Sequence, residues 1–222
     1  MNRLETLISL VAPHNCIVCD LEGDLLCNGC LNAELTEIPG RCYRCHKVSQ
    51  NQAVCKECRK TVPIRHVWVA TDYGEIPKKL IYKFKFERAV AAAGPIARKI
   101  DQFIPHLPPD TVVCHIPTAN NRVRIRGYDQ AAEIAKCLAK IRGYTYRASL
   151  VRIGKSRQVG SSRKDRFRHL NSAFRVKNYD LSRANILLID DITTTGATIE
   201  AAARTLKESG AKAIDAAVFA QA

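Results

Sequence analysis

The chain lacks any long hydrophobic run, and aromatic residues make up only 6% of it. Its unbroken apolar runs, such as residues 186–189, fall far short of the ~20 residues that a membrane-spanning helix needs. The first residues are apolar around an acid, Glu5, and cysteine pairs follow at once, which indicates a short amphipathic helix and not a secretory signal. We therefore expect a globular, cytoplasmic protein that does not span a membrane.

Acidic residues are scarce in the second part of the chain, whereas most cysteines lie in the first. Residues 1–62 hold 7 Lys and Arg against 7 Asp and Glu, so the whole net charge of +14 lies in residues 63–222. Eight of the ten cysteines come before residue 59. Two changes of composition at one place predict a domain boundary there, with a cysteine-rich domain at 1–62 and a second domain at 63–222.

The eight N-terminal cysteines form four pairs with two residues between the members of each pair. The pairs are Cys16/Cys19, Cys27/Cys30, Cys42/Cys45 and Cys55/Cys58. A two-residue gap lets a tight turn aim two thiolates at one tetrahedral ion, and two such pairs complete a closed, structural zinc site. The spacing therefore predicts two structural zinc ions, bound by consecutive pairs or by interleaved ones. Disulfides or a redox pair are the alternatives, but the shared spacing and the missing export signal favour zinc.

The second part alternates between β-type and helical patterns. Strands are predicted at 66–73, 111–116, 144–153, 184–189 and 213–219, and helices at 75–86, 87–103, 130–141 and 196–209. Residues 154–170 have no apolar period and many Gly, Ser, Arg and Lys residues, which is typical of a mobile basic loop. Strands that alternate with helices predict an α/β fold, a parallel sheet with helices on both faces.

One segment combines a buried strand with a polar turn. It reads Asn185-Ile-Leu-Leu-Ile-Asp-Asp-Ile-Thr-Thr-Thr-Gly-Ala-Thr, so that two acids follow four apolar residues and a Thr/Gly turn opens a helix. Open parallel sheets bind ligands at such strand ends, and backbone N–H groups at a helix start can enclose a phosphate. The alternative is an ordinary strand, an Asp-Asp turn and a Thr-capped helix. The candidate phosphate ligands are Thr193, Thr194, Thr195, Gly196, Ala197 and Thr198.

This segment closely resembles the phosphoribosyl pyrophosphate (PRPP) motif of type I phosphoribosyltransferases. The resemblance implies that Thr193 to Thr198 hold the 5-phosphate and that Asp190 and Asp191 bind the ribose hydroxyls, directly or through Mg²⁺. Arg122 and Arg126 follow the strand at 111–116 and are candidate diphosphate ligands, because guanidinium groups match phosphate oxygens in geometry. A solvated basic turn is the alternative for these arginines.

Together the motifs resemble the ComF/GntX family, in which a double zinc ribbon precedes a phosphoribosyltransferase domain. The shared features include the four cysteine pairs, Leu80-Ile-x-x-Phe-Lys and the Arg-Gly-Tyr sequence at 126–128. The resemblance implies a role in DNA uptake for natural transformation, with other competence proteins as partners. Two positions depart from the family pattern: Asp129 stands where Asn is usual, and Gln158 is followed by Val-Gly-Ser-Ser where a Leu is usual.

For a transferase, the expected reaction is displacement at C1 of PRPP with diphosphate leaving. Asp190, Asp191, Arg122 and Arg126 are then the catalytic candidates, with Mg²⁺ stabilising the leaving group. Related enzymes often carry an acid or a Lys in the Thr/Gly turn as a proton acceptor, but here Ile192 and Thr193 follow the two acids. This favours PRPP binding over turnover, although an active phosphoribosyltransferase of nucleobase or nucleotide metabolism stays an alternative.

A second hypothesis is the binding of single-stranded DNA, because basic segments release counterions from a phosphate backbone. The candidate residues are Lys85, Arg157, Arg163, Lys164, Arg166 and Arg168. A basic loop that serves only a small anionic ligand is an equal alternative. A third hypothesis is a zinc-stabilised protein-interaction module, since zinc ribbons often contact partner proteins.

Overall fold

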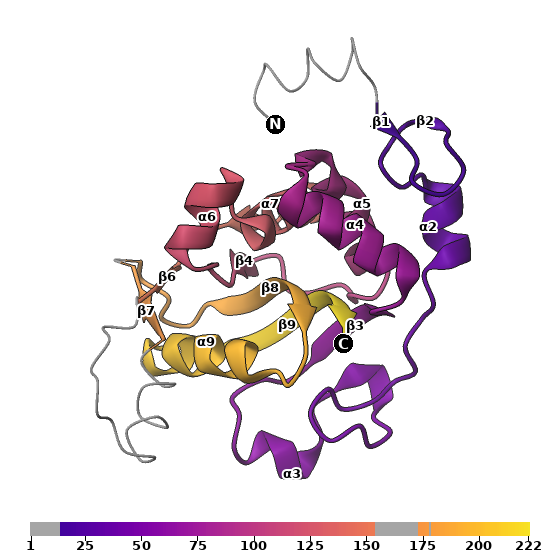
Figure 1. Ribbon diagram of the computed structural model, residues 1–222. Helices are drawn as coiled ribbons and strands as arrows, with labels where there is room; N and C mark the ends of the chain where they lie inside the picture. Colours follow the sequence, from indigo (N-terminus) through magenta and orange to yellow (C-terminus); the bar gives the residue numbers. More distant parts are fainter. Residues whose placement is uncertain (1–13, 154–172, 178) are drawn as a thin grey trace, which may run out of the picture.

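The computed structural model describes residues 14–153, 173–177 and 179–222 (Figure 1). The amphipathic helix predicted at the N-terminus lies outside these residues. So do Arg157, Arg163, Lys164, Arg166 and Arg168 of the predicted basic loop. No helix in the described ranges combines the length and the apolar character needed to cross a membrane.

A five-stranded sheet in which all neighbours are parallel forms the centre of the described structure, in the order β3-β9-β8-β4-β5. Its strands are β3 (Val67–Asp72), β4 (Val112–His115), β5 (Thr145–Tyr146), β8 (Asn185–Thr193) and β9 (Ala213–Gln221). Helices α4 (Glu75–Phe86), α5 (Ala93–Asp101) and α7 (Gln130–Arg142) cover one face, and α9 (Ala197–Glu208) covers the other (Figure 1). The predicted parallel α/β architecture is confirmed.

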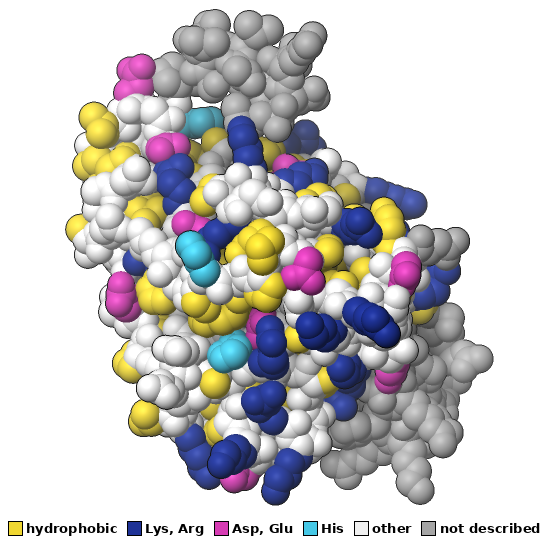
Figure 2. Space-filling model, turned by 180° about the vertical axis from the view of Figure 1, so that it is seen from behind, with side chains coloured by type: hydrophobic (Ala, Val, Ile, Leu, Met, Phe, Trp, Pro, Cys, Tyr) yellow, Lys and Arg dark blue, Asp and Glu magenta, His cyan; other side chains and the backbone are white. Residues whose placement is uncertain are grey.

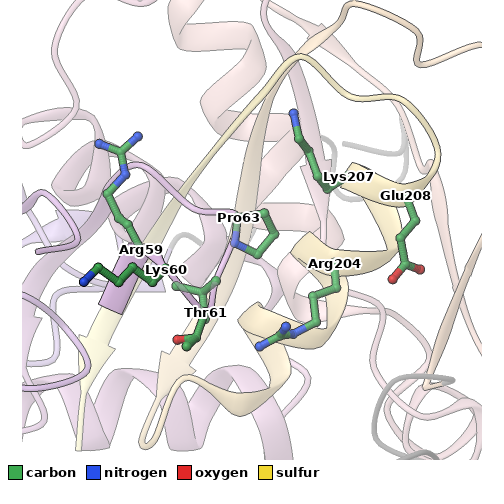
Figure 3. A pocket seen from close by; sticks show the side chains of 8 residues that line it. Arg59, Lys60, Thr61, Pro63, Arg204, Lys207 and Glu208 are labelled. Atoms are coloured by element: carbon green, nitrogen blue, oxygen red, sulfur yellow. The ribbon is translucent and has the colours of Figure 1, made fainter. Parts of the chain in front are cut away.

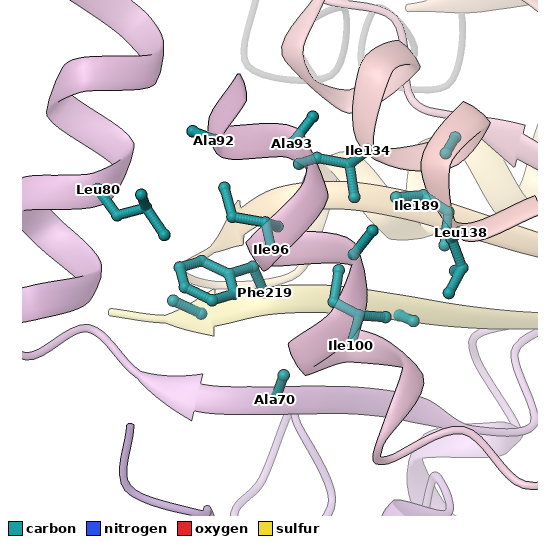
Figure 4. Packing of buried hydrophobic residues seen from close by; sticks show 14 of the residues in the cluster. Ala70, Leu80, Ala92, Ala93, Ile96, Ile100, Ile134, Leu138, Ile189 and Phe219 are labelled. Atoms are coloured by element: carbon teal, nitrogen blue, oxygen red, sulfur yellow. The ribbon is translucent and has the colours of Figure 1, made fainter. Parts of the chain in front are cut away.

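The central strand β8 is buried on both faces, which explains its unbroken apolar run. Leu187 and Ile189 pack in the core below α5 and α7, whereas Ile186 and Leu188 pack toward α9. Figure 4 shows the first core, where α5 lies against β9 and α7 lies beside it. Each fully buried aliphatic side chain contributes ~1.5–3 kcal/mol. These contacts hold β8 in place between the two layers of helices, and they therefore fix the position of the acids at its carboxyl end.

The apolar spacing in the sequence accounts for the helices. In α7 the buried side chains Ile134, Ala135 and Leu138 recur at helical spacing, and Gly143 ends the helix in the left-handed conformation at φ 68°. The predicted helix at 87–103 begins later than expected. Arg88 takes a positive φ of 55°, a short 3-10 turn follows as η2 (Val90–Ala92), and only then does α5 start.

Three other predicted boundaries differ from the structure. The strand predicted at 144–153 is two strands, because a turn at Ser149 redirects the chain and β6 (Leu150–Arg152) pairs antiparallel with β7 (Phe174–Val176). The strand predicted at 184–189 continues as β8 through Thr193, so the two acids belong to the strand. The basic segment after β4 is helical, forming α6 (Asn120–Arg126), which Gly127 ends at φ 89°.

The cysteine-rich segment passes the edge strand β3 and packs on both sides of the sheet (Figure 1). Its elements are β1 (His14–Asn15), β2 (Glu22–Gly23), α2 (Asn28–Glu34), η1 (Gln50–Gln52) and α3 (Lys56–Arg59). Leu26 and Leu31 join the core below α5, and Tyr43 and Val54 join the core on the α9 side. The Gln52 amide accepts from the Val69 N–H at 2.6 Å and donates to the Val69 carbonyl at 3.2 Å. The division into two domains near residue 62 stays a prediction.

Candidate functional site

The eight N-terminal cysteines form two groups of four. Cys16, Cys19, Cys27 and Cys30 make the first cluster, and Cys42, Cys45, Cys55 and Cys58 make the second, with ligand atoms of each group within 4.8 Å of one another. The grouping is therefore sequential and not interleaved. Sulfurs that surround zinc tetrahedrally at ~2.3 Å lie ~3.8 Å apart. The Cys19–Cys27 Sγ separation is 3.7 Å and the Cys45–Cys55 separation is 3.6 Å, so both clusters fit zinc.

The surroundings of the thiols also suit a cation. Burial raises the pKa of the Cys16 thiol, but backbone N–H groups of Cys19 and Cys27 outweigh it and bring that pKa to about 6. Burial likewise opposes the N–H groups of Cys55 and Cys45 around Cys42, whose pKa falls to about 7. Thiolates are the form that binds metal. Each cluster therefore presents one sulfur that ionises readily among neighbouring thiols.

The carboxyl end of β8 projects beyond its neighbour β4. Strand β4 ends at His115, which lies opposite Ile189, so the rest of β8 pairs only with β9, from Asp190 opposite Val218 to Thr193 opposite Gln221. Helices α6 and α7, which follow β4 in the chain, lie on one side of the sheet, whereas α9, which follows β8, lies on the other (Figure 1). Adjacent parallel strands whose connections diverge leave a crevice at their carboxyl ends, where α/β proteins bind ligands. Asp190 and Asp191 lie at this point.

The two acids face an unequal electrostatic environment. Burial and the adjoining carboxylate of Asp191 raise the pKa of Asp190 well above its usual value. Asp191 is paired with Lys85 of α4, whose Nζ lies 2.5 Å from Asp191 Oδ2. Lys85 therefore belongs to this crevice. A Lys beside two carboxylates limits their repulsion and offers a cation to an incoming phosphate or diphosphate.

The turn after β8 is largely exposed where α9 begins. Thr193 is buried, while Thr194, Thr195, Ala197 and Thr198 are exposed. Gly196 precedes α9 with φ 76°, a left-handed conformation that favours glycine. The first N–H groups of a helix have no partner within it, and the helix dipole favours an anion there. The predicted phosphate ligands therefore come together in one turn at the start of a twelve-residue helix.

The two predicted arginines lie on α6, apart from the acids. Arg126 donates from Nη1 to Gln130 Oε1 at 2.8 Å, and its guanidinium lies 5.6 Å from the centre of the Phe86 ring, next in sequence to Lys85. Arg122 is exposed. Neither guanidinium contacts Asp190 or Asp191 in the described structure. The departure at Asp129 has a structural role, since its carboxylate accepts from the Thr118 N–H at 2.7 Å and caps α7.

Sequence reasoning missed two features of this site. Lys85 was expected on a nucleic-acid surface, although it ends the Leu80-Ile-x-x-Phe-Lys motif and so carried a signal. Tyr43 of the second cysteine cluster packs against Gly196, and no local pattern could indicate a contact between residues so far apart in the sequence. A hollow of about 330 Å³ lies elsewhere, toward the other end of α9, where α3 and α9 flank a basic groove (Figure 3).

Comparisons with known proteins agree with this arrangement. A family model for the phosphoribosyl transferase domain matches residues 130–222, which contain β8, the turn and α9. The competence protein ComFC of Bacillus subtilis is 30% identical over 196 residues, covering 83% of this chain and 79% of that protein.

Two further relatives match over similar lengths. The competence protein ComFC of Streptococcus pneumoniae is 30% identical over 185 residues, covering 82% of this chain and 76% of that protein. The DNA utilization protein YhgH of Escherichia coli K12 is 24% identical over 220 residues, covering 92% and 96% of the two chains. The chain has two four-cysteine clusters followed by a phosphoribosyltransferase-type α/β domain, and it is 30% identical to the ComFC proteins over most of both chains. It therefore belongs to the ComFC family of competence proteins.

Proposed function

We propose that the chain binds PRPP together with Mg²⁺ in the crevice at the end of β8 and serves in DNA uptake during competence. The observation that carries this proposal is the juxtaposition of Asp190 and Asp191 with the exposed turn that opens α9, at the point where the helices after β4 and β8 diverge. The names of the relatives, competence proteins and a DNA utilization protein, support the biological role.

Within this proposal each group has one task. The amides and hydroxyls from Thr193 to Thr198 hold the 5-phosphate, and the Asp190 and Asp191 carboxylates hold the ribose hydroxyls. Lys85, Arg122 and Arg126 are assigned to the diphosphate, because they are the cations on α4 and α6 nearest in sequence to the motifs of the site. The two carboxylates offer the hard oxygen ligands that Mg²⁺ prefers, and bound Mg²⁺ would supply charge neutralisation for the diphosphate.

The proposal is tested by calorimetric titration of Mg·PRPP into the zinc-loaded protein. Binding should be lost in the variant with Asp190→Asn and Asp191→Asn together. Asp72→Asn is the matched control, because Asp72 ends the parallel edge strand β3 but lies outside the crevice. An unmodified protein that does not bind Mg·PRPP, or a double variant that binds it as well as the unmodified protein, would overturn the proposal.

We further propose that the site binds PRPP without rapid turnover. The turn holds no side chain that accepts a proton in the way related enzymes use one, since Ile192 and Thr193 occupy the positions after the acids. A continuous assay of diphosphate release, with nucleobases as acceptors and with single-stranded DNA present or absent, tests this proposal. Steady diphosphate release with any acceptor would instead support the active transferase.

The two cysteine clusters are proposed to hold one structural zinc ion each. Metal analysis of the purified protein should give about two zinc ions per chain. An absorbance typical of an iron–sulfur cluster would contradict the assignment. Zinc bound by thiolates also fits a cytoplasmic location, where cysteines stay reduced.

Single-stranded DNA binding is a second candidate function, favoured by an exposed aromatic pair on α4. Tyr82 and Phe86 are 56% and 64% exposed, and their ring centres lie 5.1 Å apart. Arg126 stacks near Phe86, and Ile125 beside it is 72% exposed. Aromatic rings next to cations are stacking platforms for bases, worth ~1–3 kcal/mol per base. On the face shown in Figure 2, Lys and Arg side chains gather in a broad band, whereas Asp and Glu are scattered.

Fluorescence anisotropy with labelled single-stranded DNA tests this second function. Replacing Tyr82 and Phe86 by Ala should weaken binding at least tenfold, because two stacking contacts are lost. Tyr179→Ala is the control, since this tyrosine is 43% exposed on a different part of the surface. Replacing Arg163, Lys164, Arg166 and Arg168 should reduce the salt dependence of binding. Binding that both sets of variants leave unchanged would contradict the assigned surface. An unmodified protein that does not bind single-stranded DNA would leave the zinc-stabilised protein-interaction module as the favoured alternative.

A further inference from the structure

The second cysteine cluster reaches the proposed phosphate turn through one aromatic side chain. Tyr43 follows the ligand Cys42, and its ring lies so close to Gly196 that a Cβ atom added there would be 2.2 Å from Tyr43 Cε2 and 2.9 Å from Cδ2. No other glycine in the described structure has a side chain this near to its missing Cβ. The ring therefore forms one wall of the turn that opens α9.

Tyr43 is itself held firmly from two sides. Its side chain is buried, with 2% of the residue exposed, and its hydroxyl donates to Glu200 Oε1 at 2.9 Å. The Gln221 side-chain amide, at the end of β9, donates to the Tyr43 carbonyl at 3.1 Å. The ring has little freedom, because the cluster fixes its backbone and α9 fixes its hydroxyl. A rigid wall of this kind restricts the turn to one conformation.

The same contacts control an acid next to the turn. Glu200 lies in the first turn of α9, where a carboxylate competes with any other anion for the helix N-terminus. Arg44, the neighbour of Tyr43, holds Glu200 Oε1 at 3.3 Å, and the Tyr43 hydroxyl binds the same oxygen. Arg204 lies 3.7 Å from the other carboxylate oxygen, so Arg44 and Arg204 balance the charge while the Tyr43 hydroxyl fixes the direction of the side chain. Residues 43 and 44 thus contribute to both the shape and the charge of the turn.

We propose that Tyr43 is a positioning residue for the phosphate turn and couples the second cysteine cluster, but not the first, to ligand binding. The inference rests on the proposed function, since it assumes that the turn binds PRPP. It goes further by giving the zinc ribbon a part in the site. The first cluster packs on the opposite side of the sheet, below α5, and has no such contact with the turn in the described structure.

The test is calorimetric titration of Mg·PRPP into the zinc-loaded full chain and two variants of Tyr43. Tyr43→Phe keeps the ring but removes the hydrogen bond that directs Glu200, and the loss of one hydrogen bond to a charged group predicts about tenfold weaker binding. Tyr43→Ala removes the wall as well as the hydrogen bond, so it should weaken binding more than Tyr43→Phe does. Leu26→Ala is the control, because it deletes a fully buried side chain on the first-cluster side. It should destabilise the protein and leave the affinity for Mg·PRPP unchanged.

Zinc release gives a second readout, which a merely structural role would not change. Coupling between two sites is reciprocal, so a turn filled by PRPP should retain the zinc of the second cluster. A chromogenic chelator should therefore withdraw one of the two zinc ions severalfold more slowly when Mg·PRPP is present, and Tyr43→Phe should remove this protection. The measurement on the unmodified protein needs no variant, so it stands even if Tyr43→Ala does not fold.

The outcomes separate the inference from the proposed function. An unmodified protein that does not bind Mg·PRPP defeats both. The role of Tyr43 alone is overturned if Tyr43→Phe binds Mg·PRPP as tightly as the unmodified protein does and the rate of zinc release does not depend on PRPP. Binding that falls equally in Leu26→Ala also overturns it, because the loss would then reflect general destabilisation.

Discussion

Gly196→Ala is the substitution for which the structure gives the sharpest expectation. The alanine would have to adopt φ 76°, and its Cβ would meet the Tyr43 ring at 2.2 Å. The left-handed conformation costs ~1–2 kcal/mol for a residue with a Cβ atom. Overpacking against a buried ring adds ~1–3 kcal/mol, and the lower entropy of the unfolded chain returns ~0.4–1 kcal/mol. The free energy of unfolding should therefore fall by about 1–5 kcal/mol.

A double-mutant cycle separates the two causes. In a Tyr43→Ala background the ring is gone, so Gly196→Ala should cost only about 1 kcal/mol, the backbone part. Gly143→Ala is the matched control, because Gly143 has a similar φ of 68° and nothing within 4 Å of its missing Cβ. It too should cost about 1 kcal/mol. Equilibrium unfolding in urea, with zinc-loaded protein and no ligand, measures the change in the free energy of unfolding for both single variants, the double variant and the control.

The prediction is wrong if the two substitutions are additive. Gly196→Ala would then cost the same with and without the Tyr43 ring, and the close approach would not exist in solution. It also fails if Gly143→Ala destabilises the protein as much as Gly196→Ala does. In that case the backbone conformation alone would account for the loss, and the contact between the cysteine cluster and the turn would carry no free energy.

Three further predictions follow from charges and metal ligands. The raised pKa of Asp190 means that the folded state binds its proton more tightly, so this group's contribution to stability is present below about pH 4 and is lost as pH rises. Asp190→Asn should therefore raise the melting temperature of the ligand-free protein at pH 7, with a gain that shrinks toward pH 4; equal melting temperatures at pH 7 would contradict this. Burial raises the pKa of Asp215, but His66 and Arg65 lower it by more, so that it falls below its usual value. The contribution of this carboxylate to stability is therefore present above about pH 4 and is lost at lower pH. Asp215→Asn should cost about 3 kcal/mol in urea unfolding at pH 7 and less below pH 4, since it leaves a partly buried ion pair unmatched; a cost that does not change with pH would refute the ion-pair explanation. Removal of zinc by a chelator should lower the melting temperature and broaden the transition, and readdition of zinc should restore both; an unchanged transition would show that the clusters do not need metal.

Local sequence patterns predicted most helices and strands, whereas contacts between residues distant in the sequence could not be predicted from them. The apolar run of β8 and the helical spacing of Ile134, Ala135 and Leu138 each arise within one element, so the sheet and its helices could be expected. The four cysteine pairs, each with the same internal spacing, likewise predicted two metal clusters. The helix at 120–126 was missed because its buried face is slight: no residue in it is fully buried.

The candidate site shows the same division. The acids and the turn are consecutive in sequence, and therefore visible, but the partners that shape them come from elsewhere. Lys85 arrives from α4 and Tyr43 from the cysteine-rich segment. The order in which the strands pair decides which segments meet at the carboxyl end of the sheet. The apolar pattern of one sequence identifies the strands but does not show this order.

The Gln52 contact with β3 has a consequence for assembly. Backbone groups along an exposed edge strand invite pairing with another chain, and here the side chain of Gln52 occupies both groups of Val69. The opposite edge, β5, is only two residues long. A partner protein is therefore expected to recognise side chains on this molecule, and not to extend its sheet. If the metal is lost and the flanking segment detaches, the backbone groups of β3 become free to pair with another chain, and such pairing would lead to aggregation.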